Sequence, residues 1–185
     1  MTSLNGSDRP IRLVALSGNP RPQSRTHALA VTLATEVASV LPGSTVSEVE
    51  LAGLGSRVLE PDDAAAQAAV TQVLEADILF ISSPTYKASY SGLLKSFLDR
   101  FGHQGLTGKS AVPIMLGGLA SHQLAVNVHF SPLLLELGAK VPAGGLFVLE
   151  SEVGGFSTFA ADWARAQAAV LVAASDAVTA PRPAF

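Results

Sequence analysis

The stretch Leu13-Val-Ala-Leu-Ser-Gly-Asn-Pro-Arg-Pro-Gln-Ser-Arg-Thr26 joins a short apolar run to the start of a helical pattern. The apolar run ends at Ser17, and an alanine-rich helical pattern begins near Ser24. A strand, a tight polar loop and a helix N-terminus in this order form a site for an anion. The first backbone N–H groups of a helix have no intrahelical partner, and the helix dipole favours negative charge there. The loop therefore predicts an anion site, for which phosphate is the simplest ligand.

The side chains of this loop suit the same ligand. Neutral donors and two charge-assisted donors lie within ten positions: Ser17, Asn19, Arg21, Ser24, Arg25 and Thr26. A plain strand-to-helix connection is the alternative, but so many polar groups are unusual in a chain with only 15% charged residues. The G-x-G-x-x-G spacing of dinucleotide-binding loops is absent, which favours the phosphate of a mononucleotide.

Strand and helix patterns alternate along the whole chain. The predicted strands cover residues 11–16, 45–51, 77–82, 111–116 and 144–150, and the predicted helices begin near residues 24, 62 or 63, 93, 121 and 158. Such alternation predicts an α/β fold in which helices cover both faces of an open parallel sheet. The second strand is polar and suits a sheet edge, which favours the flavodoxin-like strand order 2-1-3-4-5.

Local features lead to three further expectations. Pro113 removes a ladder hydrogen bond, so an irregularity is expected in its strand. Pro132 interrupts a helical pattern and frees a carbonyl four residues earlier, which predicts a kink or bulge near Val128–Ser131. The last helix, from Thr158 to about Thr179, is expected to bury one side. The residues expected on that side are Phe159, Trp163, Ala166 and Val170.

Composition limits the class of protein. The chain has 185 residues, no cysteine and a net charge of −3. We expect one domain at residues 10–179 between a disordered tail, 1–9, and a flexible tail, 180–185. Disulfides, thiolate metal sites and a cysteine nucleophile are excluded. A nucleic-acid partner is not expected without a basic surface. The sequence has no long apolar run and its start is polar, so we expect a cytoplasmic protein with no membrane contact.

Two further loops should lie beside the first, because ligands of doubly wound sheets bind outside the carboxyl ends of the strands. One loop contains Pro84, Thr85, Tyr86 and Lys87, and the other begins at Gly117-Gly118. Backbone polar groups and the Tyr86 ring could hold a flat heterocycle, while glycine lets a ring lie against the backbone. Both loops could also be simple connections. His122 follows the glycines and could face the ligand or the solvent.

The sequence does not support a P-loop, a metal site or a serine hydrolase motif. The segment from Gly105 to Ser110 imitates a P-loop, but its first required glycine is replaced by His103 and a strand follows where a helix should. Lys109 is therefore expected at the surface. The four histidines have no metal-binding spacing, so no metal site is expected. A G-x-S-x-G elbow is absent, and a serine hydrolase is unsupported.

With these loops placed, the chain resembles the NADPH-dependent FMN reductase family, which has a flavodoxin-like fold. It is most similar to the flavin reductases of two-component alkanesulfonate and methanesulfonate monooxygenase systems. The motifs that carry the resemblance are Ser17–Thr26, Ser83–Lys95, and Gly117-Gly118 with His122. Asn19 stands where many members have another small residue. Some close members have an inserted residue that makes a π-bulge in the fourth helix, a region that Val128 and His129 occupy here.

The resemblance implies that FMN is bound, with its phosphate on the first loop and its ring on the other two. The implied phosphate residues are Ser17, Arg21, Ser24, Arg25 and Thr26. The implied ring residues are Pro84 to Lys87, Gly117 and Gly118. Members of the family are commonly homodimers or homotetramers packed through helices.

The implied reaction is hydride transfer from NADPH or NADH to FMN, with release of reduced flavin to a flavin-dependent monooxygenase. Because the flavin carries the reactivity, we assign no catalytic side chain. One alternative is an enzyme that retains FMN and reduces quinones, azo dyes or metal oxyanions. Another is a flavodoxin that carries electrons without nicotinamide activity.

Overall fold

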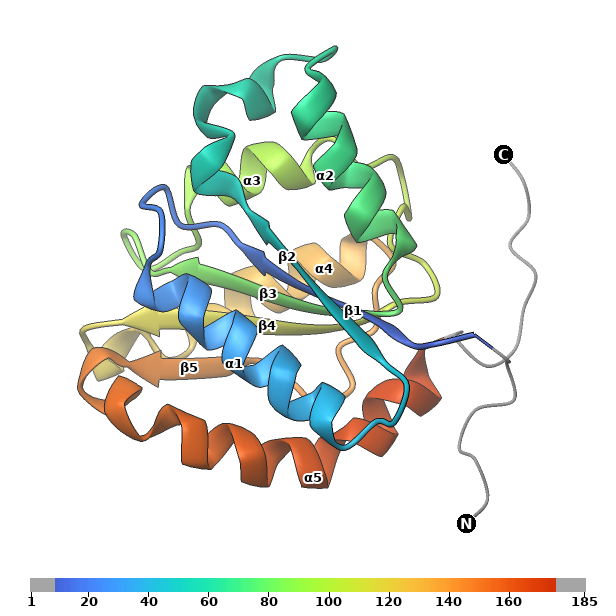
Figure 1. Ribbon diagram of the computed structural model, residues 1–185. Helices are drawn as coiled ribbons and strands as arrows, with labels where there is room; N and C mark the ends of the chain where they lie inside the picture. The colour runs from blue at the N-terminus through green and yellow to red at the C-terminus, as the bar shows by residue number, and fades with distance from the viewer. Residues whose placement is uncertain (1–8, 176–185) are drawn as a thin grey trace.

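A five-stranded parallel sheet forms the centre of the protein. The computed structural model describes residues 9–175. The sheet has the order β2-β1-β3-β4-β5, which confirms the predicted flavodoxin-like arrangement. Its strands are β1 (Arg12–Ser17), β2 (Thr45–Glu50), β3 (Ile78–Pro84), β4 (Ser110–Gly117) and β5 (Leu146–Leu149). All strands point the same way, so their carboxyl ends lie at one edge of the molecule (Figure 1).

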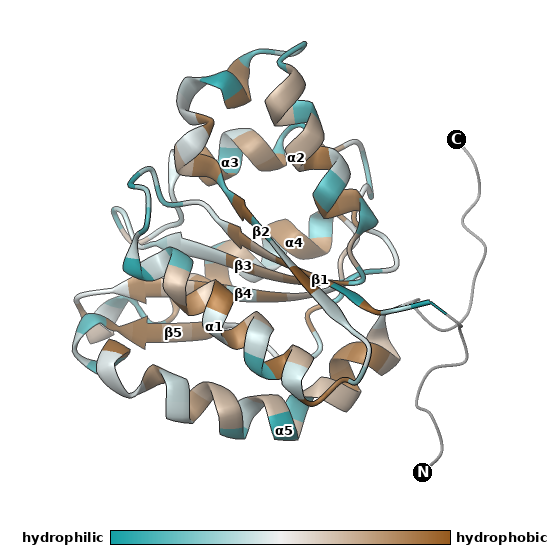
Figure 2. Ribbon diagram, in the orientation of Figure 1, coloured by the Kyte–Doolittle hydropathy of each residue, from teal (hydrophilic) through white to brown (hydrophobic). Residues whose placement is uncertain are grey.

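Helices cover both faces of this sheet (Figure 1). The helices α1 (Arg25–Ser39) and α5 (Phe156–Ala174) share one buried cluster with one face. The helices α2 (Ala64–Glu75), α3 (Gly92–Leu98) and α4 (Ser131–Glu136) lie on the other face. Apolar residues fill the central strands while β2 is more polar (Figure 2), as an edge strand should be.

Local sequence decides where three of the helices begin. Ser24, Asp63 and Ser91 each precede a helix and accept a hydrogen bond from a backbone N–H three residues later. Such caps satisfy donors that the helix cannot satisfy itself. The cap at Ser24 matters most, because it ends the loop after β1 and sets the direction in which α1 begins.

The predicted buried side of the last helix is wrong. Phe159, Ala166 and Val170 are exposed, and Trp163 is partly buried. The side that faces the protein instead carries Phe156, Ala160, Ala164, Ala168 and Leu171. Small alanine side chains let α5 lie close to α1. The prediction gave weight to bulky residues, whereas close packing of two helices selects small ones.

The predicted irregularity at Pro113 is also absent, since β4 pairs with β3 without a break. The N–H of Ala111, two residues earlier, donates to the Lys140 carbonyl at 2.7 Å on the β5 side. The missing N–H of Pro113 faces that side as well. β5 pairs with β4 only from Ile114, opposite Leu146. Pro113 thus lies between the hydrogen bond that Ala111 makes to Lys140 and the start of pairing with β5 at Ile114. Its missing N–H therefore removes no hydrogen bond from the sheet.

The predicted bulge in the fourth helical segment is confirmed. Residues Val126–Phe130 form a π-helix, which begins two residues before the predicted region. The Ser131 N–H donates to the Val126 carbonyl, and the Ser131 hydroxyl donates to the same oxygen at 3.0 Å. Pro132 then falls in the first turn of α4, where a missing N–H costs little. The π-helix runs directly into α4, so the wider turn accommodates the proline within one continuous helical segment.

The prediction that Lys109 lies at the surface is wrong. Its side chain is only 1% exposed, and Nζ donates to the carbonyls of Leu74 and Ala76. These carbonyls belong to the C-terminal end of α2, where helical carbonyls lack intrahelical partners. Lys109 therefore caps α2 from the start of β4.

The tails predicted at residues 1–9 and 180–185 lie outside the described residues, except for Arg9. Arg9 forms two hydrogen bonds to the Asp77 carboxylate, at 2.6 and 2.8 Å. None of the helices within residues 9–175 is long and apolar enough to span a membrane. The same residues contain no group of three or more histidine, aspartate or glutamate side chains placed to hold a metal ion.

Candidate functional site

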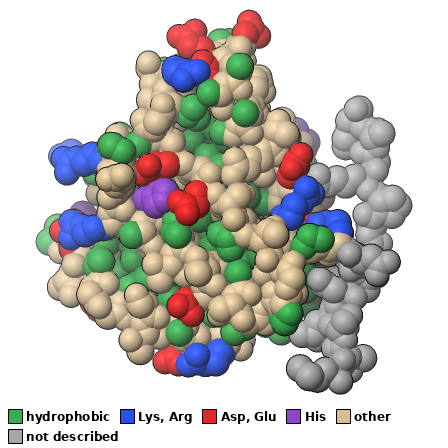
Figure 3. Space-filling view, in the orientation of Figure 1, with side chains coloured by type: hydrophobic (Ala, Val, Ile, Leu, Met, Phe, Trp, Pro, Cys, Tyr) green, Lys and Arg blue, Asp and Glu red, His purple; other side chains and the backbone are tan. Residues whose placement is uncertain are grey.

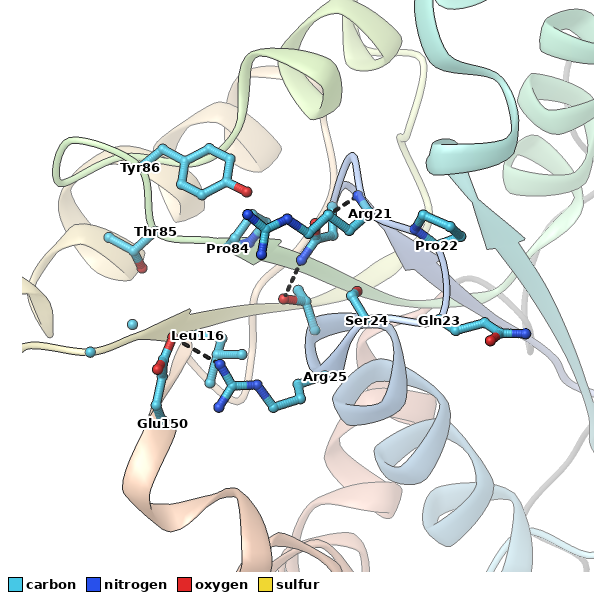
Figure 4. Close-up of a pocket in the computed structure, with 14 residues that line it drawn as sticks. Arg21, Pro22, Gln23, Ser24, Arg25, Pro84, Thr85, Tyr86, Leu116 and Glu150 are labelled. Atoms are coloured by element: carbon cyan, nitrogen blue, oxygen red, sulfur yellow. Dashed lines mark hydrogen bonds and ion pairs between the residues drawn. The ribbon is translucent and has the colours of Figure 1, made fainter.

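A cleft of about 400 Å³ opens at the carboxyl ends of β1, β3 and β4 (Figure 4). Three loops, separated by tens of residues in the sequence, line it together with Glu150, which follows β5. The lining residues are Asn19, Arg21, Pro22, Gln23, Ser24, Arg25, Thr26, Pro84, Thr85, Tyr86, Leu116, Gly117, Gly118 and Glu150. Basic side chains are present at the edge of the molecule toward which the strands point, and others lie at the opposite edge (Figure 3).

Asn19 holds the first loop in its shape. Its side-chain NH₂ donates to the Thr26 hydroxyl at 3.0 Å, and its side-chain carbonyl accepts from the Arg21 N–H at 2.9 Å. Asn19 and Thr26 are both buried. The amide thus ties the middle of the loop to the first turn of α1.

Gln23 has a left-handed backbone conformation, with φ of +52°. This conformation is unfavourable for a residue other than glycine. The Gln23 N–H donates to the Glu50 carboxylate at 2.7 Å, at the end of β2. His27 contacts the same carboxylate at 3.3 Å and that of Glu48 at 2.8 Å, and Figure 3 shows a histidine between acidic side chains on this face. The edge strand therefore holds the strained turn that precedes Ser24.

The two arginines of the loop reach the cleft from different directions (Figure 4). Arg21 is an exposed lining residue. Arg25, the first residue of α1, forms an ion pair with Glu150 at 3.1 Å across the cleft. Both partners of this pair are about half exposed, so water and salt reach the pair. The cleft thus carries two positive charges and one negative charge.

The second loop turns back on itself at the rim of the cleft. Tyr86 and Ser89 exchange two backbone hydrogen bonds, at 2.8 and 3.1 Å. The two residues between them, Lys87 and Ala88, have positive φ values of 50° and 62°. A two-residue turn of this kind usually contains Asn or Gly, so the turn stores backbone strain. The turn presents the Tyr86 ring toward the cleft (Figure 4).

Thr85 has an unsatisfied polar group in the cleft wall. Its N–H donates to the Leu116 carbonyl at 2.8 Å, which joins the second loop to β4. Its hydroxyl is buried and has no hydrogen-bond partner among residues 9–175. A buried hydroxyl without a partner is costly. Thr85 lines the cleft, and its hydroxyl lies beside the end of β4, 3.1 Å from the position of a Cβ atom on Gly117.

The two glycines after β4 have different surroundings. A Cβ atom on Gly117 would lie 2.7 Å from the Phe147 ring and 3.1 Å from the Thr85 hydroxyl. At Gly118 the nearest atom would be a Glu150 carbon at 4.0 Å. Gly117 is thus required by packing against β5, and Gly118 is open to the cleft.

Buried hydroxyl groups join the first two loops behind the cleft. The Ser91 hydroxyl donates to the Gly18 carbonyl, and the Ser91 N–H donates to the Ser83 hydroxyl at 2.9 Å. A Cβ atom on Gly18 would lie 2.5 Å from Leu94 in α3. The sequence analysis assigned no role to Ser91, although its helix-capping position was a usable signal.

Most of the residues predicted for the site line the cleft, and three do not. Ser17 is buried beneath the loop and its hydroxyl accepts from the Asn19 N–H at 3.4 Å. Lys87 is exposed at the turn, and His122 belongs to a 3₁₀ helix at Ala120–His122.

The cleft also contains residues that the sequence analysis missed. These are Pro22, Gln23, Leu116 and Glu150. Pro22 and Gln23 lie within the first loop itself. Glu150 is the last residue of the predicted fifth strand, so the rule about carboxyl ends of strands could have found it.

The comparisons with known proteins agree on one family. The family model described as NADPH-dependent FMN reductase matches residues 11–154. The chain is 36% identical over 142 residues to the NADH-dependent FMN reductase SfnF of Pseudomonas putida, covering 74% of this chain and 76% of that protein. It is 32% identical over 151 residues to the FMN reductase (NADPH) of Escherichia coli K12, covering 77% of this chain and 75% of that protein.

The structure is also similar to that of a solved reductase. The apo form of the NADH:FMN oxidoreductase EMOB superposes with a TM-score of 0.79 and 29% sequence identity. The match covers 87% of this chain and 90% of that chain.

Proposed function

The chain belongs to the NADPH-dependent FMN reductase family, and we propose that its cleft binds FMN and a reduced nicotinamide nucleotide. The observation that carries this assignment is the convergence of three loops on one cleft, with the start of α1 and two arginines at one end. That end suits a phosphate ester, because N–H groups, hydroxyls and guanidinium groups all donate to anions.

The rest of the cleft suits a flat ring. The Thr85 hydroxyl lacks a partner, and Gly118 leaves open space beside the backbone. Tyr86 presents an aromatic ring at the rim. We assign the phosphate to Arg21, Ser24, Arg25 and Thr26, and the ring to Pro84–Tyr86 with Gly117-Gly118. Ser17 and Asn19 support the phosphate loop from behind.

When bound, FMN supplies the group that accepts hydride from the nicotinamide. The chain's own residues orient the two nucleotides, hold the phosphate and leave one ring face accessible. Proton transfer is assigned to no side chain. The cleft provides its chemistry by binding and orientation alone.

Arg25 offers a direct test of this assignment. Arg25→Ala should weaken FMN binding by about 1.5–3 kcal/mol, the size of a hydrogen bond to a charged group. Riboflavin lacks the phosphate, so its affinity should change little. Arg165→Ala, an exposed arginine of α5 that pairs with Asp162, serves as the control. Equal FMN affinity in the Arg25 variant and the wild type would remove Arg25 from the phosphate site.

The activity is tested by following oxidation of NADH and of NADPH in the presence of increasing FMN. A rate that requires added FMN and saturates with it supports a flavin reductase. Oxidation that proceeds without added flavin, from protein that purifies yellow, supports the enzyme that retains FMN.

We further propose that reduced flavin passes to a flavin-dependent monooxygenase in the cytoplasm. The half-exposed Arg25 and the open rim at Tyr86 support exchange of the flavin with solvent. An alkanesulfonate monooxygenase without its own reductase should turn over when this protein, FMN and a reduced nicotinamide are supplied.

We propose self-association through residues 119–136, the segment that contains the π-helix Val126–Phe130 and α4. Its exposed apolar side chains are Leu119, Leu124, Val128 and Leu135, each more than half exposed. Large apolar groups gathered on one segment are typical of an interface. Light scattering should show a dimer or tetramer, and Leu124→Glu should shift it toward the monomer.

A further inference from the structure

Glu150 places a negative charge in a cleft that otherwise attracts anions. It follows directly after β5 and lines the cleft opposite the first turn of α1 (Figure 4). Its carboxylate lies 3.1 Å from the Arg25 guanidinium. Within residues 9–175, Arg25 is the one side chain that pairs with it.

The position of Arg25 makes this pair significant. Arg25 is the first residue of α1, where the helix dipole, the unpaired N–H groups and the guanidinium all favour the same anion. Glu150 competes for the guanidinium and adds its own negative charge beside the anion. A phosphate that binds here must displace the carboxylate from Arg25 or share the arginine with it.

The other carboxylate near the loop behaves differently. Glu50 faces away from the cleft lining and accepts a hydrogen bond from the Gln23 N–H, and His27 lies 3.3 Å from it. Its charge therefore supports the loop from behind. Glu150 has no such backbone donor among the described residues, so its charge acts on the cleft itself.

We propose that Glu150 weakens binding of the FMN phosphate, so that the flavin exchanges as a substrate and is not retained. This inference rests on the proposed function and adds to it a residue that determines whether the flavin stays or leaves. It also provides a reason for an acidic side chain in a phosphate site, where affinity alone would exclude one.

Glu150→Gln tests the proposal, because the amide keeps the size of the side chain and removes its charge. We expect FMN to bind about 2- to 5-fold more tightly, the range for a charge pair near a solvated surface. Riboflavin affinity should stay unchanged, and the rate of FMN dissociation should fall by a similar factor. The gain should shrink at high salt, which screens exposed charges.

Glu136→Gln is the matched control, since it removes the same charge from the exposed end of α4. Its FMN affinity should equal that of the wild type. Glu150→Ala is the second variant and should also tighten FMN binding. Thermal unfolding of each variant establishes that the protein is folded.

The outcomes separate the two proposals. Wild-type protein that binds neither FMN nor riboflavin contradicts the proposed function. Wild-type protein that binds FMN, with equal or weaker binding in Glu150→Gln, overturns only the role of Glu150. Equal tightening of FMN and riboflavin also overturns it, because the effect would then not depend on the phosphate.

Discussion

The backbone N–H of Gln23 donates a 2.7 Å hydrogen bond to the carboxylate of Glu50, which joins the loop after β1 to the end of β2. Gln23 holds a left-handed conformation with φ of +52°, which costs a non-glycine residue about 1–2 kcal/mol. The hydrogen bond offsets part of that cost. A residue outside the cleft lining therefore determines the shape of the predicted phosphate loop.

Loss of this bond should loosen the loop. Glu50→Ala is expected to weaken FMN binding by about 1 kcal/mol, the usual net value of a hydrogen bond, while riboflavin binding changes little. Glu48→Ala is the matched control, because Glu48 contacts His27 at 2.8 Å but not the Gln23 N–H. Equal effects of the two substitutions on FMN affinity would assign the role to His27 instead.

The buried hydroxyl of Thr85 should affect binding and stability in opposite directions. Thr85→Val keeps the shape of the side chain and removes a polar atom that has no partner among the described residues. We expect the free energy of unfolding to stay equal or rise, and FMN to bind about 2- to 10-fold more weakly. Chemical denaturation and flavin titration measure the two effects. A clear loss of stability with unchanged FMN affinity would contradict the role of this hydroxyl in binding.

Lys109 should matter for stability and not for flavin binding. Lys109→Met removes a buried ammonium group and the hydrogen bonds that it donates to the Leu74 and Ala76 carbonyls. The free energy of unfolding should fall by about 2–4 kcal/mol. Urea denaturation measures this cost. Lys95→Met is the control, since its ion pair with Asp99 lies at the surface and should contribute little. A small effect at Lys109 would show that water replaces its hydrogen bonds.

Asp77 should make the free energy of unfolding depend on pH in the acidic range. Burial acts to raise the pKa of Asp77. Hydrogen bonds from the Arg9 side chain and the Arg12 backbone, together with the positive charges of Arg9 and Arg12, outweigh burial and lower the pKa. A lowered folded-state pKa stabilises the protein above the unfolded value of about 3.9, and this contribution is lost as the pH falls through the lower folded-state value.

Asp77→Asn removes this titration. The difference in unfolding free energy between wild type and variant should be constant above about pH 5 and shrink as the pH falls below about 4. Denaturation at several pH values between 3 and 7 measures it. A difference that does not change with pH would mean that Asp77 does not titrate differently in the two states.

Much of the fold follows from local patterns in the sequence. The buried strands β1 and β3 are nearly continuous apolar runs and β2 is polar. Together with the strand–helix alternation, this polarity places β2 at a sheet edge and favours one of the common doubly wound orders. Ser24 and Asp63 cap their helices through hydrogen bonds that span only three residues. Pro132 predicted the bulge because the constraint is covalent. Each of these features depends on neighbours in the chain.

The sequence by itself determined the five parallel strands, the polar loop from Ser17 to Thr26 and the family resemblance. Only the tertiary structure decided that Lys109 is buried, that Pro113 meets a gap in the ladder and that Glu150 pairs with Arg25. The physical reason is the distance between partners. The energy of a buried charge, a missing donor or an ion pair depends on groups that lie tens of residues away and meet only when the sheet has formed.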